Sequence, residues 1–273
     1  MLRSLVGSEM CIRDRHYEDR AAYVGFEVGI PFRRAGKPAC NFLSTSALKS
    51  ILKTSSHKNA SNLPLLLFAK EPVAGKVKTR LVPHCTFEQA SKIAEILIEQ
   101  TILMALDYWP GKIILSAWGD VNNDQPFIEK MATKYSLELH QQCAGDLGQK
   151  MWQACNSFNS PVAILGCDAP RVKSQAMSHV YSVLMNGGNA IIPTEDGGYC
   201  LIALGEAKYE LFQGIEWGSA KVFDQTLRAI DGLDLAFDIL PQSYDIDRWH
   251  DIKRAANKID ALDKYLRAEG LKG

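Results

Sequence analysis

Residues 62–83, NLPLLLFAKEPVAGKVKTRLVP, join a short apolar run to a basic loop. The apolar run, residues 63–68, is predicted to form a buried strand, and an amphipathic helix is expected after the loop. The loop residues on which the prediction rests are Lys70, Gly75, Lys76, Lys78 and Arg80. Four cations so close together repel one another, so we expect an anion among them; a solvated turn is the alternative. A buried strand that leads into such a loop is a common phosphate site.

From residue 63 onward, predicted strands and helices alternate along the chain. The strands are expected at 63–68, 112–118, 137–141, 162–166, 190–193, 199–204 and 235–240. The helices are expected at 90–105, 126–135, 146–158, 174–185, 220–230 and 249–269, and Thr86 with Gln89 forms a capping box before the first. This order predicts an α/β fold with a mostly parallel mixed sheet and helices on both faces. Ligands of such sheets bind at the carboxyl ends of the strands, where the basic loop and Asp168 are expected.

Composition limits the class of ligand. Lysine plus arginine equals aspartate plus glutamate at 31 each, so no net charge draws the protein to nucleic acid or to a membrane. The basic loop is therefore a local feature that favours a small anionic ligand. The seven cysteines are scattered without a C-x-x-C pair, which argues against a zinc site or a disulfide framework and favours a cytoplasmic location. No apolar run approaches the ~20 residues of a membrane span.

The loop pattern F-A-K-x-P-x-x-G-x-V-K-T-R-L resembles the opening motif of the radical-SAM/selenodomain-associated transferases, a glycosyltransferase-like family with members assigned to arsenosugar biosynthesis. More distantly, it is similar to the first loop of nucleotidyltransferases. Later segments match the family in order: G-D-L-G at 145–148, G-C-D-A-P at 166–170, D-G-G-Y at 196–199, Trp217, and D-I-D at 245–247. The resemblance covers roughly residues 62 to 255 and implies the glycosyltransferase A fold, also called the nucleotide-diphospho-sugar transferase fold.

Residues 1–62 stand apart from the family-like part of the chain. The opening string MLRSLVGSEMCIRDR is similar to adaptor read-through found in translated metagenomic assemblies, and residues 44–62 have the composition of a linker. We predict that residues 1–62 are disordered, or a sequencing artefact followed by a linker. A genuine N-terminal extension is the alternative. Residues 63–273 are predicted to form the nucleotide-diphospho-sugar transferase domain.

The downstream matches favour phosphate binding by the basic loop. Lys70, Lys78 and Arg80 are the predicted phosphate ligands, and Gly75 belongs to the loop that holds them. Asp146 opens a predicted helix. It is either an ordinary N-cap or, as the resemblance implies, a residue near the nucleotide, and it is included among the nucleotide-binding candidates.

Two aspartates are candidates for a metal site. Asp168 comes directly after a buried strand, where it can hold a Mg²⁺ or Mn²⁺ ion that bridges two phosphates; a turn or N-cap role is the alternative. The resemblance implies that Asp168 is the counterpart of a D-x-D metal motif, although it is a single aspartate here. Asp245 is the second metal candidate. Asp247 is expected on the same side of an extended segment, or as the cap of the final helix.

The D-G-G-Y segment at 196–199 joins two predicted strands. Its functional interpretation has Asp196 contacting a sugar hydroxyl or removing a proton from the acceptor, with Glu195 as a rival for that catalytic role. The alternative is a tight turn in which the glycines permit positive φ, and both can hold together.

These expectations favour a metal-dependent, glycosyltransferase-like enzyme that uses a nucleotide-sugar donor, a small-molecule acceptor and Mg²⁺ or Mn²⁺. The first alternative is a nucleotidyltransferase that forms a nucleotide-activated small molecule from a nucleoside triphosphate. The second is an inactive nucleotide-binding protein, which the departures from the family pattern at Cys167, Gly218 and Arg248 keep open. Neither an oligomeric state nor the identity of nucleobase, sugar and acceptor follows from the sequence.

Overall fold

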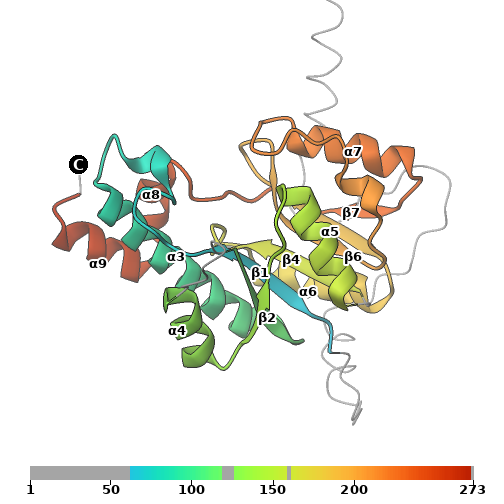
Figure 1. Cartoon of the computed structure of the whole chain (residues 1–273), viewed down its shortest axis with the longest axis horizontal. Coiled ribbons are helices and arrows are strands. Elements are labelled where there is room, and N and C mark those ends of the chain that lie inside the picture. The colour runs from blue at the N-terminus through green and yellow to red at the C-terminus, as the bar shows by residue number, and fades with distance from the viewer. Residues whose placement is uncertain (1–61, 119–125, 159–160, 272–273) are drawn as a thin grey trace, which may run out of the picture.

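The computed structural model describes residues 62–118, 126–158 and 161–271, which build one mixed α/β unit around a sheet (Figure 1). Within these residues the sheet has seven strands in the order β3-β2-β1-β4-β6-β5-β7. The strands are β1 (Leu65–Lys70), β2 (Ile113–Trp118), β3 (Glu138–Gln141), β4 (Val162–Gly166), β5 (Asn189–Pro193), β6 (Tyr199–Leu204) and β7 (Phe237–Ile239). The predicted fold class, a mostly parallel mixed sheet covered by helices, is confirmed.

One strand, β6, runs against the others. It pairs antiparallel with both β4 and β5, whereas the pairs β1–β2, β1–β4, β2–β3 and β5–β7 are parallel. The reason is the short connection between β5 and β6, because a few residues suffice for a hairpin but not for a parallel crossover. That connection is the D-G-G-Y segment, so it lies at the edge of the sheet where β4 ends.

Helices cover both faces of the sheet. They are α3 (Phe87–Tyr108), α4 (Pro126–Tyr135), α5 (Leu147–Phe158), α6 (Ser174–Met185) and α7 (Val222–Gly232). Side chains of β1 alternate between two cores: Leu65 and Leu67 pack with α3, α4 and α6, and Leu66 packs with α5 and α7. Each buried leucine contributes roughly 1.5–3 kcal/mol to folding. This burial fixes the point at which the basic loop leaves the sheet.

The C-terminal segment contradicts one prediction. Residues 249–269 were expected to form one helix, but they form α8 (Trp249–Ala256) and α9 (Asp260–Ala268). Between them Ile259 is extended, with φ −127° and ψ 96°, and only 4% of it is exposed. The break lets both helices bury apolar residues in a third core against α3. Figure 1 shows α8 and α9 beside α3 at one end of the molecule.

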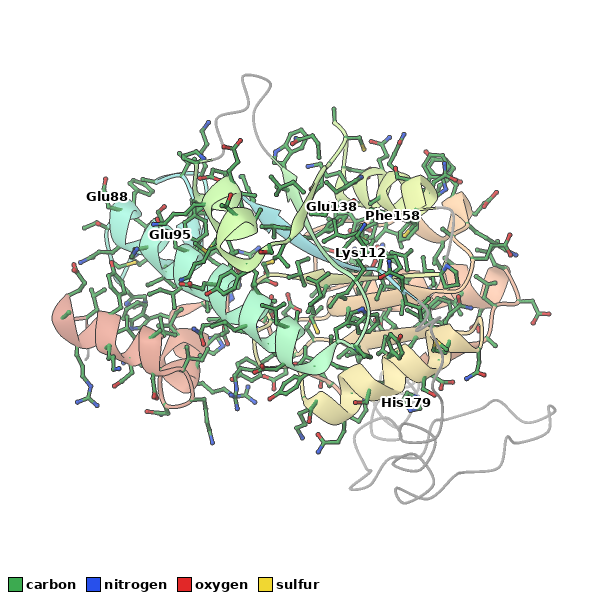
Figure 2. All side chains as sticks on the ribbon, turned by 90° about the horizontal axis from the view of Figure 1, so that it is seen from below. Glu88, Glu95, Lys112, Glu138, Phe158 and His179 are labelled. Carbon is green, nitrogen blue, oxygen red and sulfur yellow. The ribbon has the colours of Figure 1, made fainter. Side chains whose placement is uncertain are left out.

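Polar contacts join neighbouring elements at the surface. An ion pair between Lys112 and Glu138 links the starts of β2 and β3, and His179 of α6 lies 2.9 Å from Asp238 of β7 (Figure 2). The predicted capping box of α3 is confirmed, since the Gln89 amide donates to the Thr86 hydroxyl and the Thr86 amide donates to the Gln89 side chain.

Two expectations concern parts of the chain beyond this architecture. The predicted extension at 1–62 lies almost wholly outside the described residues, so the domain boundary stays a prediction. In the described part of the chain, no helix combines the length and the apolar character needed to cross a bilayer.

Candidate functional site

The basic loop connects β1 to the short 3-10 helix η1 (Thr79–Leu81). Gly75 has φ 79°, a left-handed conformation that glycine adopts without a steric penalty. Lys78 has φ 46°, which is uncommon for a residue with a side chain. Leu81 is fully buried in the third core and so anchors the turn. The loop thereby turns the Lys78 side chain inward, and only 11% of that side chain is exposed.

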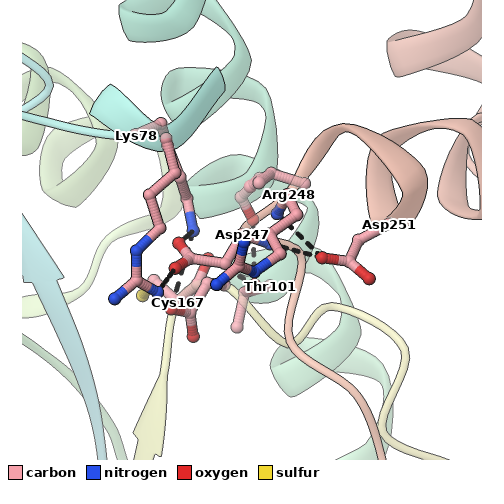
Figure 3. A network of polar contacts seen from close by, with 9 residues as sticks. Lys78, Thr101, Cys167, Asp247, Arg248 and Asp251 are labelled. Carbon is pink, nitrogen blue, oxygen red and sulfur yellow. Dashed lines mark hydrogen bonds and ion pairs between the residues drawn. The ribbon is translucent and has the colours of Figure 1, made fainter. Parts of the chain in front are cut away.

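Lys78 and Arg80 contact carboxylates that are distant from them in the sequence. The Nζ atom of Lys78 lies 3.0 Å from Oδ1 of Asp247 and 3.6 Å from Oδ2 of Asp168. Arg80 donates from Nη1 to Oδ2 of Asp247 at 2.5 Å. Figure 3 shows Lys78 and Asp247 side by side within this network. Two predicted phosphate ligands and one predicted metal ligand therefore lie together.

The pKa shifts of this group follow from burial and charge. Burial alone would lower the pKa of Lys78, but Asp168 and Asp247 outweigh it and hold the pKa above its ordinary value. Burial alone would raise the pKa of Asp247, and there the two basic side chains outweigh it and lower the pKa. Lys78 and Asp247 are therefore both charged near neutral pH.

Asp168 is held at the end of β4 by backbone contacts. The amide of Ile246 donates to the Asp168 carbonyl at 2.9 Å, which brings the 245–247 segment alongside. The hydroxyl of Thr101 in α3 donates to the carbonyl of Cys167 at 3.1 Å. Burial raises the pKa of the Cys167 thiol, which favours the neutral thiol over the reactive thiolate.

Asp245 is partly buried and lies near the carboxylates of Asp168 and Asp196. Burial and, to a smaller extent, the carboxylates of Asp168 and Asp196 together raise its pKa to about 7. Among the described residues, no three His, Cys, Asp or Glu side chains stand close enough to hold a metal ion by themselves. Hard carboxylate oxygens nevertheless suit Mg²⁺ or Mn²⁺, and Mg²⁺ commonly takes one or two carboxylates and completes its shell with substrate phosphates. The donor set fits a metal that binds together with a phosphorylated ligand.

The D-G-G-Y turn fixes the carboxylate of Asp196. Its Oδ1 atom accepts from the Thr194 hydroxyl at 2.6 Å and from the Gly198 amide at 3.0 Å. Gly197 has φ 90°, and a Cβ atom there would come within 2.2 Å of the Ala220 carbonyl oxygen. The turn interpretation is thus confirmed in its geometry. The catalytic role of Asp196 stays a prediction. It is compatible with the structure, because the Oδ2 atom accepts no hydrogen bond from the residues that the structure describes.

Glu195 has a different surrounding from Asp196. Its two carboxylate oxygens accept from Nη1 of Arg254 at 2.9 and 2.8 Å, on an exposed surface. Arg254 also stacks on the ring of Tyr244 at 3.9 Å. This contact ties α8 to the D-G-G-Y turn, and it makes Glu195 a less suitable proton acceptor than Asp196.

The remaining nucleotide candidates lie on the β1–β2–α5 side of the site. Lys70 ends β1, and its Nζ donates to the Lys76 carbonyl at 2.8 Å, which closes the loop on itself. Asp146 accepts the Gln149 amide at 2.8 Å, while the Asp146 amide donates to the Gln149 side chain at 3.1 Å. Asp146 is therefore the N-cap of α5, as the structural alternative had it, and nucleotide binding by it stays a prediction.

The structure corrects the expectation for Asp247. It was considered as a cap of the final helix, but the amides of Asp247 and Arg248 both donate to Asp251, at 3.2 and 2.8 Å. Asp251 therefore caps the start of α8, and the Asp247 side chain is free to pair with the basic loop. The alternation of polar and apolar residues in D-I-D correctly indicated that both aspartates lie on one side of the segment, because Ile246 between them is fully buried while the two aspartates face the site.

A separate hollow of about 490 Å³ lies beside the start of α4. It is lined by Glu71, Pro72, Val73, Glu95, Pro126, Phe127 and Lys130, none of which is a predicted site residue. Glu71 is 7% exposed and accepts the amides of Phe127 and Ile128, so its carboxylate serves the N-terminus of α4. The hollow is distinct from the Lys78 and Asp168 cluster.

The fold is an α/β fold of the nucleotide-diphospho-sugar transferase type. A solved structure from Desulfovibrio desulfuricans G20, provisionally assigned as a nucleotide-diphospho-sugar transferase, is 26% identical with a TM-score of 0.65; the match covers 76% of this chain and 96% of that one. Two weaker matches are a cytidylyltransferase from Leptospira borgpetersenii (13%, TM-score 0.47, 77% and 95% covered) and the manganese complex of Rv0371C from Mycobacterium tuberculosis (12%, 0.45, 73% and 100%). These two carry no argument about function.

Part of the chain also matches a protein family. Residues 109–219, less than half of the chain, match the family described as "Uncharacterized protein conserved in bacteria (DUF2064)". No curated protein matches the sequence. The association with radical-SAM or selenodomain proteins, and with arsenosugars, stays a prediction.

Proposed function

We propose that this protein is a metal-dependent transferase that moves a sugar from a nucleotide-activated donor to a small-molecule acceptor in the cytoplasm. One observation carries the proposal: the basic loop and the D-I-D segment meet Asp168 at the carboxyl end of β4, with Lys78 3.6 Å from Asp168. Cations and hard carboxylates at one strand end are the two groups that a nucleotide diphosphate and its metal need. The resemblance of the ordered motifs supports the same function.

In this proposal the loop binds and orients the phosphates. Lys70, Lys78 and Arg80 contact phosphate oxygens, and each charge-assisted contact contributes roughly 1.5–3 kcal/mol. Asp168 and Asp245 would hold the metal. A bound Mg²⁺ or Mn²⁺ supplies neutralisation of the charge that develops on the diphosphate leaving group.

Asp196 is the proposed proton acceptor. Its Oδ1 atom is held by Thr194 and Gly198, so the carboxylate keeps one orientation while Oδ2 faces the acceptor hydroxyl. A general base within hydrogen-bond reach of the acceptor commonly contributes 10²–10⁴-fold to the rate. Glu195, the rival, is paired with Arg254.

The second candidate is a nucleotidyltransferase that acts on a nucleoside triphosphate. The basic side chains gathered around β1 favour it, because a triphosphate carries more negative charge than a diphosphate sugar. The two reactions differ in their products. Sugar transfer releases a nucleoside diphosphate, and nucleotidyl transfer releases pyrophosphate.

The test uses the full chain with panels of nucleotide sugars and nucleoside triphosphates, each with Mn²⁺ or Mg²⁺ and mixed small-molecule acceptors. Asp168→Ala is compared with Asp260→Ala, an exposed carboxylate at the start of α9. We expect nucleoside diphosphate release by the wild type and by Asp260→Ala, with loss of turnover in Asp168→Ala. Full activity of Asp168→Ala removes the metal role. Pyrophosphate release promotes the second candidate, and nucleotide binding without any turnover indicates an inactive nucleotide-binding protein.

A further inference from the structure

A tryptophan and two lysines gather beside the basic loop. Lys70 and Trp118 are direct neighbours in the parallel pairing of β1 with β2. Lys150 of α5 places its Nζ atom 3.6 Å from the centre of the Trp118 ring. Because side chains alternate along a strand, Lys70 lies on the same face as Leu66, which packs toward α5. All three side chains therefore stand on the α5 face, at the carboxyl ends of β1 and β2.

The two lysines of this group form no ion pair within the described residues. Lys70 donates to a backbone carbonyl and Lys150 stands over the indole ring, and neither lies within ion-pair distance of a carboxylate in the parts of the chain that the structure describes. Burial is the main cause that lowers the pKa of Lys150; the charge of Lys70 acts in the same direction, and Cys143 and Asp146 act against it. Two cations that repel each other beside a half-buried aromatic face indicate a ligand that is both anionic and aromatic.

We propose that Trp118 is the stacking platform for the nucleobase, and that Lys150 moves off the indole ring to pair with the phosphates alongside Lys70. A lysine within about 6 Å of an indole face is held by the ring quadrupole, and this contact is weak enough at a partly exposed site to be exchanged for a base. Stacking on an aromatic side chain accepts every nucleobase, because each has a π-face. The proposal thus names where the base binds without fixing which base it is.

The distance between strands would allow a single nucleotide to contact both Trp118 and the cluster of Lys78 and Asp168. β1 lies between β2 and β4, so Trp118 and Asp168 are separated by two strand spacings, roughly 10 Å. That separation is comparable with the distance from the base to the phosphates of an extended nucleotide. This inference rests on the proposed function, since it assumes that the phosphates lie at Lys78 and Asp168.

The experiment measures binding to the full chain by calorimetry. The probes are UDP, GDP, ADP and CDP, with inorganic pyrophosphate as a ligand that has phosphates but no base. Trp118→Leu removes the aromatic face and Trp118→Phe keeps one. Lys150→Met is compared with Lys264→Met, an exposed lysine of α9 far from the group. Thermal melting of each variant establishes that it is folded.

We expect Trp118→Leu to weaken nucleoside diphosphate binding about tenfold or more while pyrophosphate binding is unchanged, and Trp118→Phe to restore most of the affinity. Lys150→Met should weaken both ligands, and Lys264→Met neither. Equal nucleotide affinity in wild type and Trp118→Leu overturns the inference and leaves the proposed function intact. If the wild type binds no nucleotide at all, the proposed function fails as well. If pyrophosphate binding falls as much as nucleotide binding in Trp118→Leu, the tryptophan has only a structural role and the inference is wrong.

Discussion

Replacing Asp245 by asparagine should stabilise the ligand-free protein, although the residue is a candidate metal ligand. The Asp245 carboxyl is partly buried beside Asp168 and Asp196, and its pKa is raised to about 7. An aspartate in an unfolded chain has a pKa of about 3.9. Between these two values the native state binds more protons than the unfolded state, so stability falls as the pH rises. Ionising Asp245 in the folded protein therefore costs free energy at neutral and alkaline pH.

The expected gain in stability is estimated from the pKa shift of Asp245. About three pKa units correspond to roughly 4 kcal/mol at 1.36 kcal/mol per unit. Because the carboxyl is only partly buried, solvent screening reduces this figure, and we expect about 1–2 kcal/mol. Asparagine has nearly the same shape and stays neutral at every pH. Asp245→Asn should therefore exceed the wild type in free energy of unfolding by about 1–2 kcal/mol at pH 8, and the difference should shrink towards zero as the pH falls to about 4.

Urea denaturation of the full chain at pH 4.5, 6 and 8, with metal removed by EDTA, measures this difference. Asp247→Asn is the matched control with the opposite sign. Burial alone would raise the pKa of Asp247, but Lys78 and Arg80 lower it, so its contribution is present above about pH 4 and is lost below it. Asp247→Asn should thus destabilise the protein by about 1–3 kcal/mol at pH 8. A stability difference between Asp245→Asn and wild type that does not change with pH refutes the reasoning. Added Mn²⁺ should stabilise the wild type and not Asp245→Asn.

Three further substitutions test the packing of the site, each by urea denaturation at pH 7. Lys78→Met removes the ion pair with Asp168 and one of the two cations that pair with Asp247, and it should cost about 1–3 kcal/mol. The part of this cost that comes from Asp247 should disappear at acidic pH, once that carboxylate is protonated. Gly197→Ala combines φ 90° with a Cβ 2.2 Å from the Ala220 oxygen, so it should cost more than about 2 kcal/mol; Gly214→Ala, at φ 69° with no neighbour within 4 Å, should cost only about 1 kcal/mol. An equal cost for both means that the contact has no effect. Thr86→Ala removes the cap of α3 and should cost about 1 kcal/mol, and an unchanged stability would contradict the capping box.

The sequence predicted the fold class because the spacing of apolar residues within each segment distinguishes strands from helices. The buried strands read as short apolar runs, and the cap of α3 was visible in the pair Thr86 and Gln89. The same reliance on local spacing explains why the prediction of a single helix at 249–269 was wrong. Helical periodicity continues through the break, and only the burial of Ile259 against α3 makes two helices more favourable than one. That contact lies in tertiary structure, outside the reach of a local pattern.

The sequence allowed the candidate site residues to be named, but it did not predict which of them contact one another. Lys78 and Asp247 are 169 positions apart, and they meet because β4 lies beside β1 and the Ile246 amide docks on the Asp168 carbonyl. The role of Lys150 left no signal at all in the sequence, since one lysine on a helix is ordinary until the strand order places Trp118 beneath it.

These pairings change which cations contribute most to the binding of an anion. From the sequence, Lys70, Lys78 and Arg80 were predicted as phosphate ligands without a ranking among the three. In the structure Lys78 and Arg80 already pair with Asp247, so a phosphate must compete with that carboxylate and gains less than a full charge-assisted contact. Lys70 and Lys150 form no ion pair with a carboxylate among the described residues, and a bound anion would relieve the repulsion between them. If the proposed function is right, we expect Lys70 and Lys150 to contribute more to the net electrostatic gain of phosphate binding than Lys78 and Arg80, whose ion pairs with Asp247 also hold the loop against the D-I-D segment.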